Sequence, residues 1–100
     1  MSRIPKPPPE LSPTGKKLWR AILAEWPITD SVHLTVLRTA LESLDRADRC
    51  RAIVDREGEV IKDRFGQAKP HPLLAAERDA RSSFLQAVKT LGLDPTQIEV

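Results

Sequence analysis

The chain has 100 residues, of which 40% are hydrophobic but only 4% are aromatic, and its net charge at pH 7 is +2. A chain of this length makes one domain with a modest core, so self-association is expected to bury further surface. No apolar run approaches the roughly 18 residues of a membrane span, and no signal peptide is evident, which predicts a soluble intracellular protein. The single cysteine, Cys50, excludes an internal disulfide and a cysteine-rich zinc site.

Basic side chains concentrate near the N-terminus. Residues 1–20 carry five basic side chains and one acidic one, whereas residues 21–100 carry 11 basic and 13 acidic side chains. A smaller positive cluster lies within residues 60–70. This distribution suits a polyanionic partner, although surface lysines that only meet solvent would give the same composition.

Residues 1–11, MSRIPKPPPEL, contain four prolines and cannot form a helix. They predict an extended, basic, polyproline-like arm; a Pro-x-x-Pro ligand for an SH3-type domain is the alternative interpretation. We expect three parts along the chain: the arm at 1–11, a helical oligomerisation and DNA-binding domain at 12–95, and a C-terminal tail at 96–100.

The first helix is predicted to begin with Ser12 as N-cap and Pro13 at the first helical position, and to end near Trp26 before Pro27. Its apolar face consists of Leu18, Trp19, Ile22, Leu23 and Trp26. The two tryptophans are able to stack on nucleic-acid bases, but their helical spacing among Leu and Ile favours the core.

The second helix is predicted from Thr29 or Asp30 to Glu57, about 27 residues, with Gly58 ending it. It carries a stripe of large residues, Leu34, Leu37, Leu41 and Leu44. A second stripe is small, and we expect it to form the oligomer interface: Val36, Ala40, Ser43, Ala47, Cys50 and Val54. The distal half alternates in charge, which predicts the pairs Glu42–Arg46, Asp45–Arg49 and Arg51–Asp55 and a contact with another subunit or with solvent.

After Gly58, short β-capable runs at residues 60–62 and 69–70 flank a turn at Gly66-Gln67, which predicts a β-hairpin. A third helix should follow, with Pro72 in its first turn and Gly92 closing it after Leu91, and the context of His71 suits a helix N-cap or a turn. Its apolar face is Leu73, Ala80, Phe84, Ala87, Val88 and Leu91. The predicted fold is mainly α: three helices with a long central one, in an antiparallel helical hairpin with a short β-hairpin at the connection.

No catalytic constellation is evident. The sequence lacks a phosphate-binding glycine loop, a zinc-protease motif and a paired-carboxylate site. Cys50 could be a catalytic nucleophile only if the fold happened to bring it next to His33 or His71. Its place on the stripe of small residues favours a packing role. Asp45, Asp48 and Asp55 are the nearest approach to a metal cluster, but arginines are interleaved with them. We therefore expect no enzyme activity, cofactor or metal.

The basic residues of the arm and of the first helix are the principal candidates for DNA contacts. They are Arg3, Lys6, Lys16, Lys17 and Arg20. The hairpin supplies a second candidate set, Lys62, Arg64 and Lys69. Cations at these positions would neutralise backbone phosphates, so binding should weaken steeply with salt.

Several short motifs occur in a characteristic order: PKPP at residues 5–8, Leu11-Ser12, Lys17-x-Trp19, Ile28-Thr29-Asp30, Gly58-x-Val60-Ile61-Lys62, Gly66, His71-Pro72 and Leu91-Gly92-Leu93-x-Pro95. In this order they resemble the small subunit of a tailed-phage terminase, of the compact type that opens with a PKPP arm and closes on LGLxP. The resemblance implies a non-enzymatic homo-oligomer that assembles into a ring and acts in the cytoplasm of an infected bacterium. It also implies recognition of double-stranded viral DNA and its presentation to the large subunit, which holds the ATPase and nuclease.

Two other classes remain open from the residues. One is a protein–protein adaptor in which the second and third helices present a groove. The other is a small DNA-binding regulator whose helix-turn-helix would lie at the turn of residues 26–29. Its recognition helix would begin with Asp30, Ser31, His33 and Thr35, a poor set for phosphate or guanine contacts.

Overall fold

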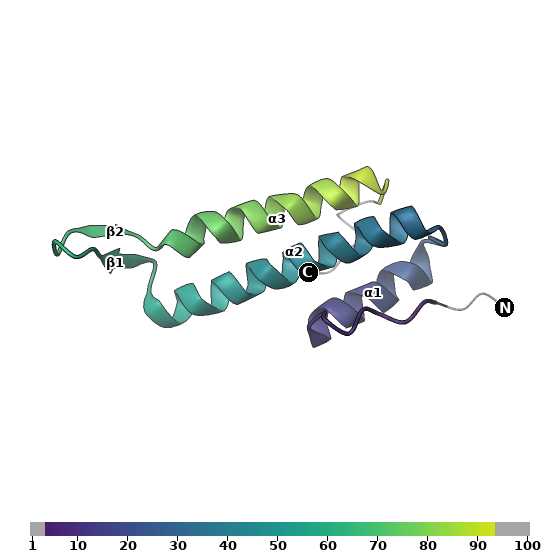
Figure 1. Ribbon diagram of the computed structural model, residues 1–100, viewed down its shortest axis with the longest axis horizontal. Helices are drawn as coiled ribbons and strands as arrows, with labels where there is room; N and C mark the ends of the chain where they lie inside the picture. Colours follow the sequence, from purple (N-terminus) through teal and green to yellow (C-terminus); the bar gives the residue numbers. More distant parts are fainter. Residues whose placement is uncertain (1–3, 94–100) are drawn as a thin grey trace.

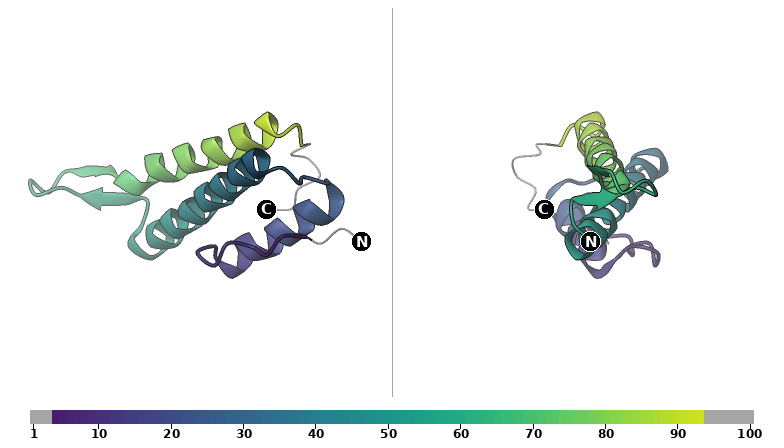
Figure 2. Two further views of the ribbon diagram at one scale, coloured as in Figure 1. Left: turned by 45° about the vertical axis from the view of Figure 1, so that its right-hand side comes forward. Right: turned by 90° about the vertical axis from the view of Figure 1, so that its left-hand side faces the viewer.

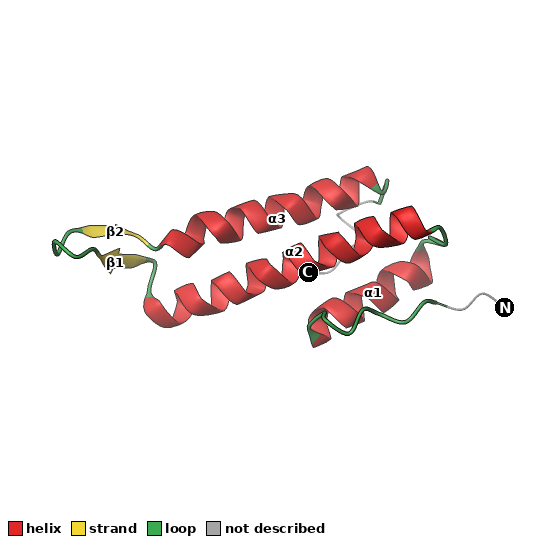
Figure 3. Cartoon of the chain, in the orientation of Figure 1, coloured by secondary structure: helices red, strands yellow, loops and turns green. Residues whose placement is uncertain are grey.

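The computed structural model describes residues 4–93 (Figure 1). In chain order the elements are α1 (Pro13–Glu25), α2 (Ser31–Glu57), β1 (Val60–Lys62), β2 (Ala68–Pro70) and α3 (Pro72–Thr90). Figure 3 shows that helices dominate and that the two strands form a small ribbon between α2 and α3. The predicted fold class is confirmed. Within residues 4–93, no helix has the length and apolar character that crossing a membrane requires.

The molecule is elongated, with principal extents of 61 × 23 × 21 Å. Helix α3 runs antiparallel to α2 along most of its length, while α1 lies beside only the N-terminal half of α2 (Figures 1 and 2). The C-terminal half of α2 and the first turns of α3 therefore form a two-helix arm that α1 does not reach. The hairpin extends this arm further.

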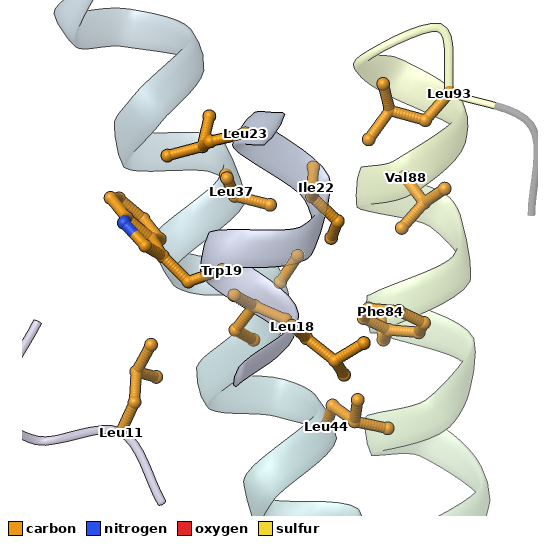
Figure 4. Packing of buried hydrophobic residues seen from close by; sticks show 12 residues of the cluster. Leu11, Leu18, Trp19, Ile22, Leu23, Leu37, Leu44, Phe84, Val88 and Leu93 are labelled. Atoms are coloured by element: carbon orange, nitrogen blue, oxygen red, sulfur yellow. The ribbon is translucent and has the colours of Figure 1, made fainter. Parts of the chain in front are cut away.

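The main core lies where the three helices meet. Leu37 and Leu41, from the predicted large stripe of α2, are 0% exposed, and Leu44 is 2% exposed. Figure 4 shows Leu37 and Leu44 of this stripe in one cluster with Leu18 and Ile22 of α1 and with Phe84 and Val88 of α3. Leu11 and Leu93 close the cluster from outside the helices. Burial of these aliphatic groups is the main force that holds α1 and α3 on α2.

The small stripe of α2 packs mainly inside the chain. Ala47 and Val54 are 0% exposed, and Cys50 is also buried. Within the described residues, α3 is the only helix beside the C-terminal half of α2, and the small side chains there let α3 approach closely (Figure 1). The sequence indicated a close neighbour correctly, but the neighbour that the structure shows is a helix of the same chain.

The charges of the two-helix arm also pair across α2 and α3. Arg51 Nε lies 3.1 Å from Glu77 Oε1, and Arg81 Nη2 lies 3.3 Å from Asp48 Oδ1. The predicted Arg51–Asp55 pair is present at 3.7 Å. These charges therefore stabilise the helix pair itself, in addition to meeting solvent. Two further predicted pairs, Glu42–Arg46 and Asp45–Arg49, are not formed.

The connection between α2 and α3 follows local signals in the sequence. Gly58 ends α2 with φ 94°, a backbone angle that favours glycine. The strands then pair antiparallel, with Val60 opposite Pro70, Ile61 opposite Lys69 and Lys62 opposite Ala68. The predicted hairpin is confirmed, with β2 beginning one residue earlier than expected.

His71 joins the two long helices at this connection. It is 5% exposed, and its Nδ1 accepts a hydrogen bond from Leu73 N at 3.0 Å, which confirms the predicted N-cap of α3. Because Nδ1 accepts, the ring proton is on Nε2, which donates to Glu57 Oε1 at 2.8 Å. One imidazole thus links the end of α2 to the start of α3.

We expect the free energy of unfolding to fall in acid because of two hydrogen-bonded carboxylates, Glu57 and Asp30. The hydrogen bond from His71 lowers the pKa of Glu57 below its ordinary value of 4.5, with a smaller contribution from Arg56. The backbone N–H of His33 lowers the pKa of Asp30 below 3.8. Since both folded-state pKa values are depressed, this stability is present above the unfolded values and is lost as pH falls through the folded ones.

The measurement is the urea midpoint followed from about neutral pH into the acid range. Glu57→Gln should flatten the acid limb of that curve, because the glutamine does not titrate. Superimposable acid limbs for the wild-type protein and Glu57→Gln would show that this carboxylate contributes nothing to the pH dependence.

Candidate nucleic-acid interface

The N-terminus of α1 is fixed to the middle of α2 by one carboxylate. Asp45 Oδ2 accepts from Ser12 N at 2.8 Å, and Asp45 Oδ1 accepts from Ser12 Oγ at 2.6 Å. The Ser12 hydroxyl oxygen accepts from Gly15 N at 3.0 Å, as an N-cap does. Asp45 is 4% exposed, and the positive end of the α1 dipole favours its charge. A predicted surface charge is therefore the anchor of α1.

Gly15 allows this close approach. A Cβ atom at Gly15 would lie 3.0 Å from both carboxylate oxygens of Asp45, which Ser12 already holds in place. The absence of a side chain is what lets the first turn of α1 sit on the carboxylate. This anchor also sets where Lys16, the next residue, lies.

The described part of the N-terminal arm folds back along α1 (Figures 1 and 2). Trp19 Nε1 donates to Pro5 O at 2.8 Å, and Leu11 is buried in the core. Arg38 Nη2 pairs with Glu10 Oε1 at 2.9 Å, which adds a link from the arm to α2. Residues 5–11 are thus held against the helices by hydrogen bonds, burial and an ion pair.

This folding back brings three predicted DNA-binding residues together. The arm and α1 enclose an open groove of about 520 Å³, lined by Ile4, Pro5, Lys6, Pro7, Pro9, Lys16 and Arg20. Among the described residues, the charged ones that line it are Lys6, Lys16 and Arg20, so this part of the groove is cationic. Lys17 is exposed on α1 but does not line the groove. Arg3, the fifth residue predicted for this set, lies outside the described residues.

The two tryptophans belong to the folded body. Trp19 is 4% exposed and its indole N–H is engaged by Pro5, while Trp26 is half-buried against the core. The interpretation of these residues as core residues is confirmed for Trp19. Its role at this site is to hold the arm, which positions Lys6 near the cations of α1.

The second predicted set lies at the hairpin, at the opposite end of the long axis from the turn that joins α1 to α2 (Figure 1). Lys62, Arg64 and Lys69 are all exposed. Lys69 is opposite Ile61 and Lys62 is opposite Ala68, so the two lysines point to opposite faces of the ribbon. The structure therefore places this set around the tip and does not join it to the arm groove.

Arg46 and Arg49 were assigned to ion pairs within α2 by the sequence and were not among the predicted DNA-binding residues. Asp45 is taken by Ser12, and Glu42 lies 3.5 Å from Arg38. Within residues 4–93, neither Arg46 nor Arg49 forms an ion pair, and both are exposed. The sequence shows that Arg38 has the same i,i+4 spacing to Glu42 as Arg46 and can compete for it. It does not show that Asp45 forms hydrogen bonds with Ser12 at the start of α1. These two arginines lie on the half of α2 between the groove and the hairpin.

The residues predicted for an oligomer interface fall into two groups. Ala40, Ala47, Cys50 and Val54 are buried within the chain, so in this fold they offer no surface to another subunit. Val36 and Ser43 are half-buried. Val36 lines a shallow groove of about 410 Å³ between α2 and α3, whose other lining residues are uncharged: Ser82, Ser83, Gln86, Ala87 and Thr90. The interface remains a prediction, and only this part of the stripe is exposed to a neighbour.

The start of α2 carries an anion where a recognition helix would need cations. Asp30 caps α2 by accepting from His33 N at 3.0 Å, and its Oδ2 lies 2.6 Å from His33 Nδ1. Both side chains are exposed. Within residues 4–93, this end of α2 included, no three side chains among His, Cys, Asp and Glu are grouped so that they could hold a metal ion.

Comparison with known proteins adds one finding. The family model described as "Phage terminase, small subunit" matches residues 15–99. No curated protein and no solved structure matches the chain. The match covers α1, the long helix pair and the hairpin, so it extends over nearly all of the fold described above. The chain therefore belongs to the phage terminase small subunit family.

Proposed function

We propose that this protein is an oligomeric DNA-binding adaptor of a phage packaging machine. It recognises double-stranded viral DNA in the cytoplasm of the infected bacterium and delivers it to the large terminase subunit. The observation that carries the DNA-binding part is the groove in which the folded-back arm gathers Lys6, Lys16 and Arg20. Family membership supplies the packaging context.

The groove suits a phosphate backbone better than a small acidic ligand. It is open, and its described lining residues are Ile4, prolines and three cations, none of which is a buried polar side chain that could orient a small molecule. The N-terminal arm supplies Lys6, and α1 supplies Lys16 and Arg20. Each of these cations can therefore contact a different phosphate along a DNA strand. Contacts of this kind fix the position of DNA without reading its sequence. Recognition of a particular viral site must therefore come from further contacts.

Self-assembly is the second part of the proposal. The groove at Val36, between the N-terminal half of α2 and the C-terminal half of α3, is lined by uncharged residues in a chain in which 30% of residues are charged. We assign this groove to a second copy of the chain. A closed assembly, such as a ring, would repeat the cationic groove around its circumference and raise the avidity of individually weak contacts.

The large subunit is the proposed enzymatic partner. The small subunit then changes the rate at which its partner hydrolyses ATP or cuts DNA, and performs neither reaction alone. An assay of both activities, with and without the small subunit, tests this directly. ATP hydrolysis or Mg²⁺-dependent cutting by the purified small subunit would contradict it.

Two measurements on the wild-type protein test the proposal. Affinity for duplex DNA, measured by fluorescence anisotropy, should fall steeply between low and physiological salt. Light scattering at tens of micromolar should give a mass several times that of the 11.2 kDa chain. A monomer that binds no DNA would favour the alternative of a protein–protein adaptor. An assembly that does not bind DNA would support the self-association part of the proposal and contradict the DNA-binding part.

A further inference from the structure

The tip of the β1–β2 hairpin presents one aromatic ring among cations. Phe65 is 75% exposed, more than any other large hydrophobic residue in residues 4–93. The guanidinium carbon of Arg64 lies 5.0 Å from the centre of its ring, a cation–π distance. Lys62 and Lys69 are exposed on the two faces of the ribbon below it. The tip therefore combines a π-surface with positive charge on every side.

The turn fixes the backbone that carries this ring. Asp63 Oδ1 accepts from Phe65 N at 2.8 Å and from Gln67 N at 3.0 Å. Asp63 N donates to Gln67 O at 2.9 Å, and Gly66 takes the positive φ of 79° that the turn requires. Asp63 is also the only acidic side chain between residues 60 and 70, and its carboxylate is engaged by the turn. The tip is thus pre-organised, and the surface around it is cationic.

We propose that this tip binds duplex DNA, with the Phe65 ring inserted against a base step and the neighbouring cations on the flanking phosphates. The proposal rests on the DNA-binding function above and names a second contact element, separate from the arm groove. DNA offers a π-face and anionic oxygens within one base step, which matches the composition of the tip. Apolar side chains that wedge between base steps beside basic residues are a known way of bending DNA.

A protein partner is the less favoured occupant. An apolar anchor for a protein pocket is usually surrounded by further apolar contacts that exclude water. The next exposed apolar side chain of the hairpin, Val60, lies at the other end of β1, and cations surround Phe65 instead. A two-stranded ribbon is also narrow enough to enter a groove of B-DNA. Figure 1 shows that no other described element flanks the tip, so its path to a duplex is open.

The experiment compares Phe65→Ala and Phe65→Trp in the full chain, with Val60→Ala as the control for an exposed apolar residue on the same ribbon. Affinity for a duplex is measured by anisotropy at several salt concentrations. A fluorescent base analogue and a donor–acceptor pair on the duplex ends report unstacking and bending. Circular dichroism verifies that each variant is folded, as expected for a side chain outside the core.

Phe65→Ala should weaken binding about tenfold and abolish the unstacking signal, because base–aromatic stacking contributes on that scale. Its salt slope should equal that of the wild-type protein, since no phosphate contact is lost. Phe65→Trp should retain both signals, and Val60→Ala should change neither.

If Phe65→Ala binds DNA as tightly as the wild-type protein, the insertion of Phe65 is overturned and the proposed function is preserved. Loss of large-subunit binding alone would assign the tip to a protein partner, which also overturns the wedge. If the wild-type protein binds no duplex, the proposed function itself fails.

Discussion

Asp45→Ala is expected to lower the free energy of unfolding by about 2–4 kcal/mol, because it removes two charge-assisted hydrogen bonds and the anchor of α1. The carboxylate is almost fully buried, so water cannot replace it well at Ser12 N. For a domain of this size, the loss corresponds to roughly 10 °C or more in Tm. Asp48→Ala is the matched control, because its ion pair with Arg81 is exposed and should contribute less than about 1 kcal/mol.

A double-mutant cycle with Gly15 tests the same contact from the other side. Gly15→Ala alone should destabilise, since its methyl group displaces the carboxylate that Ser12 holds. In the Asp45→Ala background the methyl group has room, and the better helix propensity of alanine should make the change stabilising, by up to about 1 kcal/mol. Equal effects of Gly15→Ala in both backgrounds, or equal losses for Asp45→Ala and Asp48→Ala, would show that the anchor is unimportant.

Ala47→Glu should destabilise the fold by about 3–5 kcal/mol, because it forces a charge and extra volume between α2 and α3. Ala47 is 0% exposed, so a glutamate there would lose its contact with water. Val36→Glu should behave differently. Its side chain lies in the open α2–α3 groove, so the monomer should stay folded while the mass of the assembly falls.

Urea denaturation and light scattering separate these outcomes, and Ala52→Glu, an exposed change on the same helix, serves as the control for added charge. A folded Ala47→Glu protein with wild-type stability would mean that this stripe does not hold α2 to α3. Wild-type mass for Val36→Glu would remove the Val36 groove from the proposed subunit interface.

Local signals in the sequence were sufficient to predict the elements of this fold. Ser12-Pro13, Asp30 and His71-Pro72 each begin a helix where capping rules place one, and Gly58 ends α2. These signals act over one helical turn, so they do not depend on the rest of the chain. The same is true of the hairpin, whose turn is built from adjacent residues.

Long-range contacts could not be predicted in this way. Nothing near Asp45 indicates that a serine 33 residues earlier will take its carboxylate and leave Arg49 without its predicted partner. A stripe of small residues such as Ala47 and Cys50 indicates a close neighbour but not which helix supplies it. The folding back of the arm, which Trp19 secures through Pro5, was equally hidden, although it creates the cationic groove.

The central claim is that the cations of this groove carry DNA binding. Its most direct test is the slope of log affinity against log salt concentration for Lys16→Ala/Arg20→Ala, beside Arg78→Ala/Lys89→Ala. The second variant removes the same charge from exposed positions of α3. The groove variant should reduce the slope by about 1.8 for each subunit that contacts DNA, and the α3 variant should leave it unchanged. Equal slopes for the wild-type protein and the groove variant, or an equal reduction in both variants, would contradict the claim.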